Sequence, residues 1–122
     1  MVAFNFMPQF AELVASGVKT QTLRRNQKAK VGKRLQLYTG QRTKNCRKLI
    51  TPDPVVVLVD YCAIRKHYIT FGNSDNHPRC QDEFARADGF ADYAEMYDWF
   101  CNRYKASEFV GYVTKWQPFT EE

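Results

Sequence analysis

The sequence of 122 residues has no apolar run near the roughly 18–20 residues that a membrane-spanning helix needs. Its first residues, Met1–Phe6, lack the charged start and long apolar stretch of a secretory signal peptide. It also lacks internal repeats, low-complexity tracts and linkers. We therefore expect a cytoplasmic protein with no membrane partner, folded as one domain over residues 1–122.

No Cys-x-x-Cys pair occurs among the four cysteines, which are Cys46, Cys62, Cys80 and Cys101. Disulfides would require secretion, and nothing at the N-terminus indicates it. His77 and Cys80 could each donate to zinc, but the paired spacing of structural zinc sites is missing. The sequence therefore predicts free thiols, no metal and no cofactor.

Acidic residues are absent between Lys19 and Lys48, a segment that holds eleven lysines and arginines. Eight acidic residues lie between Asp75 and Glu108 instead. A basic segment of this kind attracts polyanions, although it can also be a solvated loop that keeps the protein soluble. Stacking and neutral hydrogen-bonding groups lie among the charges and favour RNA binding; they are Tyr38, Thr39, Gln41 and Thr43.

Apolar periodicity predicts the secondary structure. Strands are expected over residues 2–6, 19–25, 34–39, 55–62, 68–71 and 109–116. Helices are expected between Pro8 and Gly17, over 81–87, and from Asp92 to Tyr104. Residues 26–32 and 40–48 are expected to be basic loops. Because strands and helices do not alternate regularly, the order favours an α+β fold or a small barrel.

The longest β-branched run, residues 55–62, is expected to be a central strand. The helix beginning near Asp92 carries aromatic and apolar residues at helical spacing, which is more typical of a core than of a cofactor site. We expect Met96 and Phe100 to pack this helix against the 55–62 strand.

Four stretches together resemble a known family. Ser16–Arg24 (SGVKTQTLR) ends a helix with Gly-x-Lys and continues as T-x-T-[I/L]-R, which resembles the signature of the ASCH family in the PUA-like superfamily. Leu35–Leu49 resembles a branch of that family common in phages and prophages, as does Asp82–Phe90 with the Met96 and Trp99-Phe100 that follow. Phe109–Trp116 matches the closing strand of the family.

The resemblance implies a small PUA-like, mostly antiparallel β-barrel with flanking helices around a cleft. Some relatives are amidohydrolases acting on N4-acetylcytidine, and others are reported as ribonucleases. A Lys, a Thr and a Glu carry the amidohydrolase reaction. Lys19 and Thr22 match the first two, and Glu95 is the nearest match to the third. Because residues 40–48 and 82–90 resemble the other branch, RNA or nucleotide binding is the preferred function and hydrolysis is the alternative.

The hydrolytic reading assigns one role to each of the three residues. Lys19 would take the proton of the Thr22 hydroxyl, which requires its pKa to be lowered by burial or by a cation such as Arg24. Glu95 would then protonate the departing nitrogen. Each residue also has a structural alternative. Lys19 follows a helix C-terminus, and Thr22 is an ordinary strand residue. Glu95, three residues after Asp92, fits a capping box.

The catalytic reading also sets a geometric condition. Lys19 and Thr22 are three residues apart, so a flat strand would place them on opposite faces unless the chain twists, bulges or turns near Thr20.

The binding reading names a wider set of contacts and a partner. The partner is RNA or a modified nucleoside, bound by a protein expected to be monomeric. A weaker alternative is a protein-interaction module whose partner face is the acidic region 75–108. The residues expected to contact nucleic acid are Lys19, Arg24, Arg25, Tyr38, Thr39, Arg42, Lys44 and Arg47.

Overall fold

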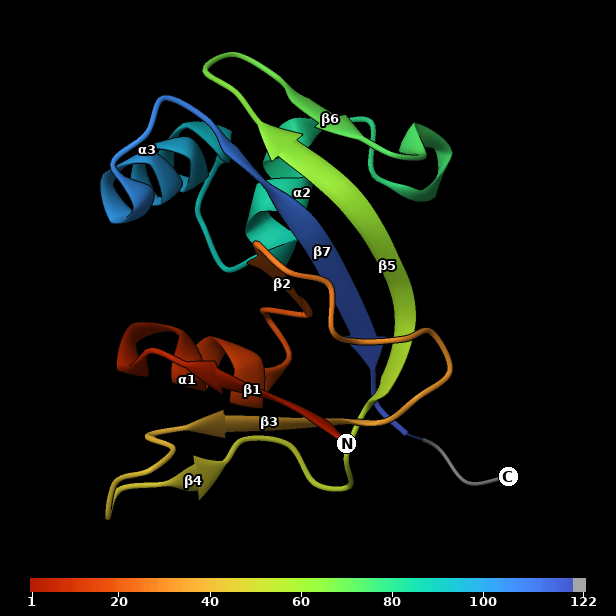
Figure 1. The fold of residues 1–122 in the computed structure, drawn as a ribbon, viewed down its shortest axis with the longest axis vertical. Coiled ribbons are helices and arrows are strands. Elements are labelled where there is room, and N and C mark those ends of the chain that lie inside the picture. The colour runs from red at the N-terminus through yellow and green to blue at the C-terminus, as the bar shows by residue number, and fades with distance from the viewer. Residues whose placement is uncertain (120–122) are drawn as a thin grey trace.

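The computed structural model describes residues 1–119 and has a mixed α+β architecture (Figure 1). Three α-helices cover two separate β-sheets, and the strands of the described residues do not close into one barrel. The sheets meet at one corner, where Arg34 and Val55 form an isolated antiparallel bridge. None of the helices is both long enough and apolar enough to span a membrane, within the part of the chain described.

The smaller sheet has the strand order β1-β3-β4. Strands β1 (Val2–Phe6) and β3 (Leu35–Thr39) pair in parallel, because α1 and β2 carry the chain back between them. The loop expected over 40–48 ends in a two-residue strand, β4 (Arg47–Lys48), antiparallel to β3. Leu35 and Leu37 are fully buried, as the alternating pattern predicts.

The larger sheet is antiparallel with the order β2-β7-β5-β6. Its members are β2 (Gln21–Arg24), β5 (Val55–Ile64), β6 (Ile69–Phe71) and β7 (Phe109–Gln117). The prediction that the 55–62 run is a central strand is confirmed, since β5 pairs with β7 on one side and β6 on the other. Its register with β7 shifts between Val56 and Leu58, a bulge that bends the strand.

The helices begin and end near the predicted residues. Helix α1 (Pro8–Ser16) has proline in its first turn and ends at Gly17, whose φ of 85° is the left-handed conformation that glycine adopts easily. Helix α2 (Gln81–Ala87) and helix α3 (Tyr93–Tyr104) follow the short 3-10 turn Ser74–Asn76. Asp92 caps α3 by accepting a hydrogen bond from the Glu95 backbone N–H.

Two hydrophobic clusters form the core. One joins α2 and α3 to the larger sheet, and Met96 and Phe100 of α3 belong to it, as predicted. The other lies between α1, the smaller sheet and Trp116 of β7. Phe10 of α1 packs against both clusters. The region where the two clusters approach each other contains the candidate site.

Candidate functional site

A cavity of about 320 Å³ opens where α1, the end of β1, β2 and α3 come together. Its wall combines buried charged groups with aromatic rings. The lining residues are Asn5, Phe6, Met7, Phe10, Lys19, Thr22, Leu23, Arg24, Asp88, Phe90, Trp99, Phe100, Arg103 and Tyr104.

The turn after α1 brings Lys19 into this wall. The Lys19 backbone N–H donates to the Leu13 carbonyl, and the Thr20 N–H donates to the Ala87 carbonyl, each at 2.9 Å. Strand β2 therefore begins only at Gln21. Lys19 lies in the turn before the strand, which allows it to line the same cavity as Thr22.

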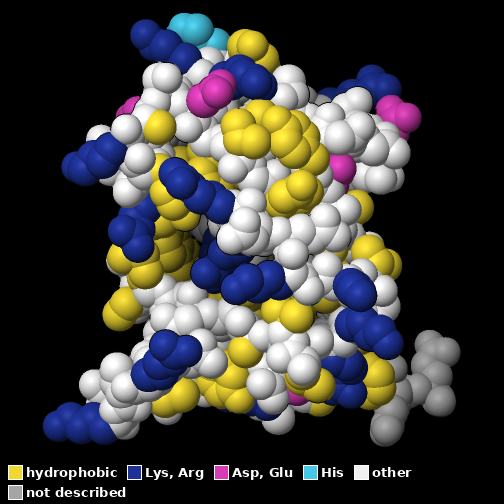
Figure 2. Space-filling view, viewed as in Figure 1, with side chains coloured by type: hydrophobic (Ala, Val, Ile, Leu, Met, Phe, Trp, Pro, Cys, Tyr) yellow, Lys and Arg dark blue, Asp and Glu magenta, His cyan; other side chains and the backbone are white. Residues whose placement is uncertain are grey.

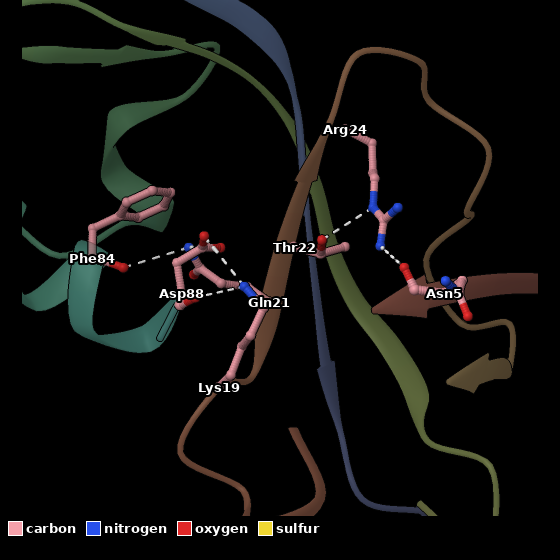
Figure 3. Close-up of polar contacts among 7 residues, drawn as sticks. All are labelled: Asn5, Lys19, Gln21, Thr22, Arg24, Phe84 and Asp88. Atoms are coloured by element: carbon pink, nitrogen blue, oxygen red, sulfur yellow. Dashed lines mark hydrogen bonds and ion pairs between the residues drawn. The ribbon is translucent and has the colours of Figure 1, made fainter. Parts of the chain in front are cut away.

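Lys19 and Asp88 form a buried pair. Lys19 is 4% exposed and Asp88 is 1% exposed. The Lys19 amine donates to the Asp88 carbonyl at 2.5 Å and lies 3.3 Å from its carboxylate Oδ2. The Gln21 amide donates to Asp88 Oδ1 at 3.3 Å and more weakly to the Phe84 carbonyl at 3.5 Å (Figure 3). Every polar atom of the Asp88 carboxyl thus has a partner from the turn and start of β2.

Burial shifts the pKa values of this pair in opposite directions. Desolvation lowers the pKa of the Lys19 amine, an effect opposed by Asp88 and increased by the Arg24 charge. Desolvation raises the pKa of the Asp88 carboxyl, an effect opposed mainly by Lys19. The buried amine is therefore easier to deprotonate, and the buried carboxyl easier to protonate, than the same groups exposed to water.

Asp88 can reach Lys19 because Gly89 follows it. Gly89 has a φ of 97°, and a Cβ added there would lie 3.2 Å from Leu13 Cδ1 and 3.4 Å from Lys19 Cδ. A larger residue would be strained in the backbone and crowded against α1. The Asp88-Gly89 pair at the end of α2 is thus suited to the close approach of α2 to the turn after α1.

Thr22 and Arg24 project to the other side of β2 (Figure 3). The Arg24 Nε donates to Thr22 Oγ1 at 3.2 Å, and its Nη2 donates to the Asn5 carbonyl at 3.0 Å. The guanidinium also lies 4.9 Å and 5.2 Å from the ring centroids of Phe4 and Phe6. Burial lowers the pKa of Arg24, which still carries its charge because the guanidinium remains protonated in proteins.

Lys19 and Thr22 share the cavity wall but are not bonded to each other among the described residues. The Lys19 amine is held by Asp88 on one side of β2, and the Thr22 hydroxyl accepts from Arg24 on the other. The expected hydrogen bond from the Lys19 amine to the Thr22 hydroxyl is therefore not formed. Phe6 lies between the two cations, 5.9 Å from the Lys19 amine and 5.2 Å from the Arg24 guanidinium.

Aromatic side chains form the rest of the wall. Phe10 meets Trp99 edge to face at 5.3 Å between ring centroids and meets Phe90 in the same way at 5.6 Å. At the rim, Arg103 is exposed, and the Arg25 guanidinium lies 4.4 Å from the Tyr104 ring. The cavity thus offers flat apolar surfaces inside and cations at its mouth.

The structure does not bring Glu95 into this site. Glu95 is exposed and does not line the cavity. Its carboxylate accepts from the Ala91 N–H at 3.0 Å, and its own N–H donates to Asp92 Oδ1 at 2.9 Å. The capping alternative describes it correctly. The carboxyl group in the cavity is that of Asp88, which the sequence reasoning missed although Asp88-Gly89 lies in the motif-like stretch 82–90.

The eight residues expected to contact nucleic acid do not form one site. Lys19, Arg24 and Arg25 lie in or beside the cavity. Thr39 and Arg47 line a neighbouring hollow beyond Asn5–Met7. A separate hollow is lined by Tyr38 and Arg42, and Lys44 is exposed on the loop.

Two members of the loop group are engaged within the protein. The Thr39 hydroxyl donates to the Phe6 carbonyl at 2.8 Å. Arg47 pairs with Glu12 at 2.8 Å. Lys48, next to Arg47, pairs with Asp53 at 2.8 Å. Acidic residues from elsewhere in the chain thus neutralise part of the segment that contains no acid of its own.

The potential zinc donors are not assembled. His77 is bonded to Asp60 at 2.8 Å, and Cys80 is an exposed free thiol. Over residues 1–119, no group of three or more His, Cys, Asp or Glu side chains is placed to hold a metal ion.

Comparison with known proteins found no matching family model, no matching curated protein and no matching solved structure.

Proposed function

We propose that the protein is an ASCH-type RNA-binding domain that holds one unpaired base, or a free nucleoside, in the cavity. The observation that carries this proposal is the combination in one hollow of Trp99 and Phe10 with the cations Lys19 and Arg24. Ligand sites usually have volumes of about 300–1,000 Å³, so a cavity of about 320 Å³ suits a single base or nucleoside.

The chemistry of the wall matches what an unstacked base presents. RNA-binding proteins stack exposed bases on aromatic rings and bind their edges through polar groups. Here the Lys19 amine and the Asp88 carboxyl line the cavity as donor and acceptor, and a base edge would take the place of part of their bond to each other. Arg103 at the mouth suits a phosphate oxygen.

A PUA-like relationship remains part of this proposal. It is supported by the helix-turn-strand arrangement in which Lys19, Thr22 and Arg24 all line one cavity. It is also supported by the corner at Arg34 and Val55, where the two sheets are joined as neighbouring parts of a barrel would be.

The binding experiment uses the intrinsic fluorescence of Trp99. We expect cytidine, uridine, adenosine and guanosine monophosphates to change this emission on titration, with one of them preferred. Trp116, the other tryptophan, is 5% exposed and lies in the second core cluster, so its emission should respond little. Trp99→Phe should remove the signal while calorimetry still detects binding. Absence of binding by calorimetry at millimolar nucleotide would refute the cavity as a nucleotide site.

Hydrolysis of an acylated base is a second candidate, favoured by one observation. A lysine with a lowered pKa and a carboxyl group with a raised pKa line the same cavity as the Thr22 hydroxyl. A neutral Lys19 could take the Thr22 proton once its amine leaves Asp88. Protonated Asp88, in place of Glu95, could then supply a proton to the leaving nitrogen.

The reaction on N4-acetylcytidine would balance as follows. A bond forms between Thr22 Oγ1 and the acetyl carbon, the bond from that carbon to N4 breaks, and cytidine leaves with the Asp88 proton. Water then cleaves the Thr22 ester to acetic acid and restores the Thr22 hydroxyl, and the proton on Lys19 returns to Asp88. Chromatography should detect cytidine in the wild type and none with Thr22→Val. Lack of turnover of N4-acetylcytidine or RNA by the wild type would remove this candidate and leave binding intact.

A further inference from the structure

One row of residues crosses the larger sheet from the cavity to the exposed part of the sheet. Arg24 of β2 pairs with Tyr112 of β7, and Tyr112 pairs with Tyr61 of β5. Directly opposed residues of antiparallel strands point to the same face. The face that carries Thr22 and Arg24 into the cavity therefore carries Tyr112 and Tyr61 beyond it, with Tyr61 about 10 Å, or two strand spacings, from Arg24.

The two tyrosines form an accessible aromatic pair. Their ring centroids are 6.2 Å apart with the planes at 81°. Tyr61 is 39% exposed, and Tyr112 is partly exposed. Further along β7 the same face is covered, because Trp116 is buried against Phe6 of the smaller sheet. The smaller sheet thus leaves the tyrosine end of the face open to solvent.

Basic side chains lie on the connection that crosses the lower part of this sheet, toward the Val56 end of β5. The connection from β2 to β3 passes in front of β7 and β5 in Figure 1, and it is held there by a hydrogen bond from the Gly32 N–H to the Val56 carbonyl at 2.9 Å. Figure 2 shows an apolar patch over the upper part of this sheet with Lys and Arg side chains below and to its left. The exposed cations of the connection are Arg25, Lys28, Lys30 and Lys33.

Of the acidic groups closest in sequence to the tyrosines, Asp60 points to the opposite face of β5, and Glu108 is ion-paired. Asp60 precedes Tyr61, and its carboxylate is bonded to His77 at 2.8 Å and to the Asn73 N–H at 3.0 Å. Glu108, near the start of β7, pairs with Arg65 at 3.2 Å. The face therefore combines two aromatic rings with basic side chains on the same side of the sheet, a combination that single-stranded nucleic-acid sites use.

We propose that Tyr112 and Tyr61 stack the bases next to the one held in the cavity, so that the ligand is single-stranded RNA of at least three nucleotides. This inference rests on the proposed cavity function and extends it from a nucleoside to a strand. Arg24 lies at the junction, between the cavity and the first tyrosine. The strand then runs across β7 and β5, away from the loop over residues 40–48.

Affinity should depend on the length of the ligand. Calorimetry with oligouridylates and oligocytidylates of one to six nucleotides should show a rise in affinity from one to three nucleotides and a smaller rise beyond. Tyr61→Leu and Tyr112→Leu should each weaken trinucleotide binding by roughly five-fold to a hundred-fold, the range for loss of one base–aromatic stack. Neither should change binding of the mononucleotide.

Control variants separate stacking from other effects. Tyr61→Phe and Tyr112→Phe keep the rings and should keep the length dependence, and Val110→Ala, at another exposed apolar position, should keep it too. An unchanged length dependence in both leucine variants would overturn the proposal. The proposal would also be overturned if the leucine variants differed from the wild type only in molar mass by light scattering. In that case a second copy of the chain, and not RNA, would cover the face.

The two proposals can fail separately. If mononucleotides do not bind but longer strands bind in a tyrosine-dependent way, the cavity function fails and the stacking surface stands. If mononucleotides bind and added nucleotides contribute nothing, the stacking surface fails and the cavity function stands.

Discussion

Lys19 in the cavity and Arg47 in the basic loop over residues 40–48 belong to the same acid-free stretch of sequence but differ in what surrounds their charges. Lys19 in the cavity is 4% exposed and bonded to a buried carboxylate. Arg47 at the end of the loop meets Glu12 with both side chains largely in water. Salt and water weaken the second pair, whereas the first pair is shielded from both. The number of charges in a segment therefore says little about where a specific site lies.

The largest expected effect comes from breaking each pair in turn. Asp88→Ala leaves the buried Lys19 amine without a partner and should lower the free energy of unfolding by about 3–5 kcal/mol. Glu12→Ala, which breaks the exposed pair with Arg47, should change it by less than about 1 kcal/mol. Urea unfolding measures both, and Lys19→Met combined with Asp88→Leu should recover much of the loss. Similar costs for the two single variants would contradict the distinction between the regions.

The pH dependence of stability should also report on the cavity. Because the Asp88 pKa is raised in the folded protein, the folded state binds more protons than the unfolded chain above about pH 4. Stability should therefore fall as pH rises from about 4 toward the folded pKa of Asp88, by at most about 1.4 kcal/mol per pH unit.

A variant that cannot titrate checks this effect of pH on stability. Asp88→Asn cannot titrate, so urea unfolding across pH 4–8 should lack the fall. Lys19 acts in the opposite sense at alkaline pH: its lowered pKa makes the unfolded chain bind more protons, so stability should rise with pH up to about 10.4. The test is the difference in unfolding free energy between the wild type and Asp88→Asn. If this difference is the same at pH 4 and at pH 7, the buried titration of Asp88 is contradicted.

A smaller effect distinguishes the two regions as phosphate contacts. Neutralising one phosphate contact should reduce the slope of log affinity against log salt by about 0.7 for single-stranded RNA. We expect Arg103→Gln, at the cavity mouth, to reduce the slope by about this amount and Lys44→Gln, on the loop, to leave it unchanged. The reverse result would move the phosphate path to the loop, as the sequence alone suggested.

The smallest effect concerns the thiols. Cys46 in the loop is exposed, whereas Cys62 in β5 is buried, and burial raises the pKa of its thiol. Ellman's reagent should therefore modify Cys46 quickly in the native protein and Cys62 only after unfolding. Mass spectrometry of the modified peptides would identify each site. Fast modification of native Cys62 would show that β5 opens readily.

The sequence predicted the local structure well because that structure follows local patterns. Leu35 and Leu37 alternate as a half-buried strand requires, and Pro8 and Gly17 mark the ends of α1. The β1–β3 parallel pairing was not predicted, since it depends on the path of the chain through α1 and β2. The two-residue strand β4 is too short to have a period of its own.

The site was only partly predictable for a similar reason. Lys19, Thr22 and Arg24 were found because they lie within one short motif. The carboxyl partner of Lys19 lies 69 residues away in sequence, at the end of a different helix. Glu95 was selected because it was the nearest match in the expected region, and its spacing from Asp92 instead made it a helix cap.

Phe10 connects the cavity to both hydrophobic clusters. This ring lines the cavity and packs against both hydrophobic clusters. A ligand that presses on Phe10 therefore contacts a residue that belongs to the packing of both clusters. Amide hydrogen exchange should then slow on nucleotide binding in β3 as well as in α3, although β3 contributes no residue to the cavity. The two clusters, which share strands β5 and β7, would then be protected together when the cavity is occupied.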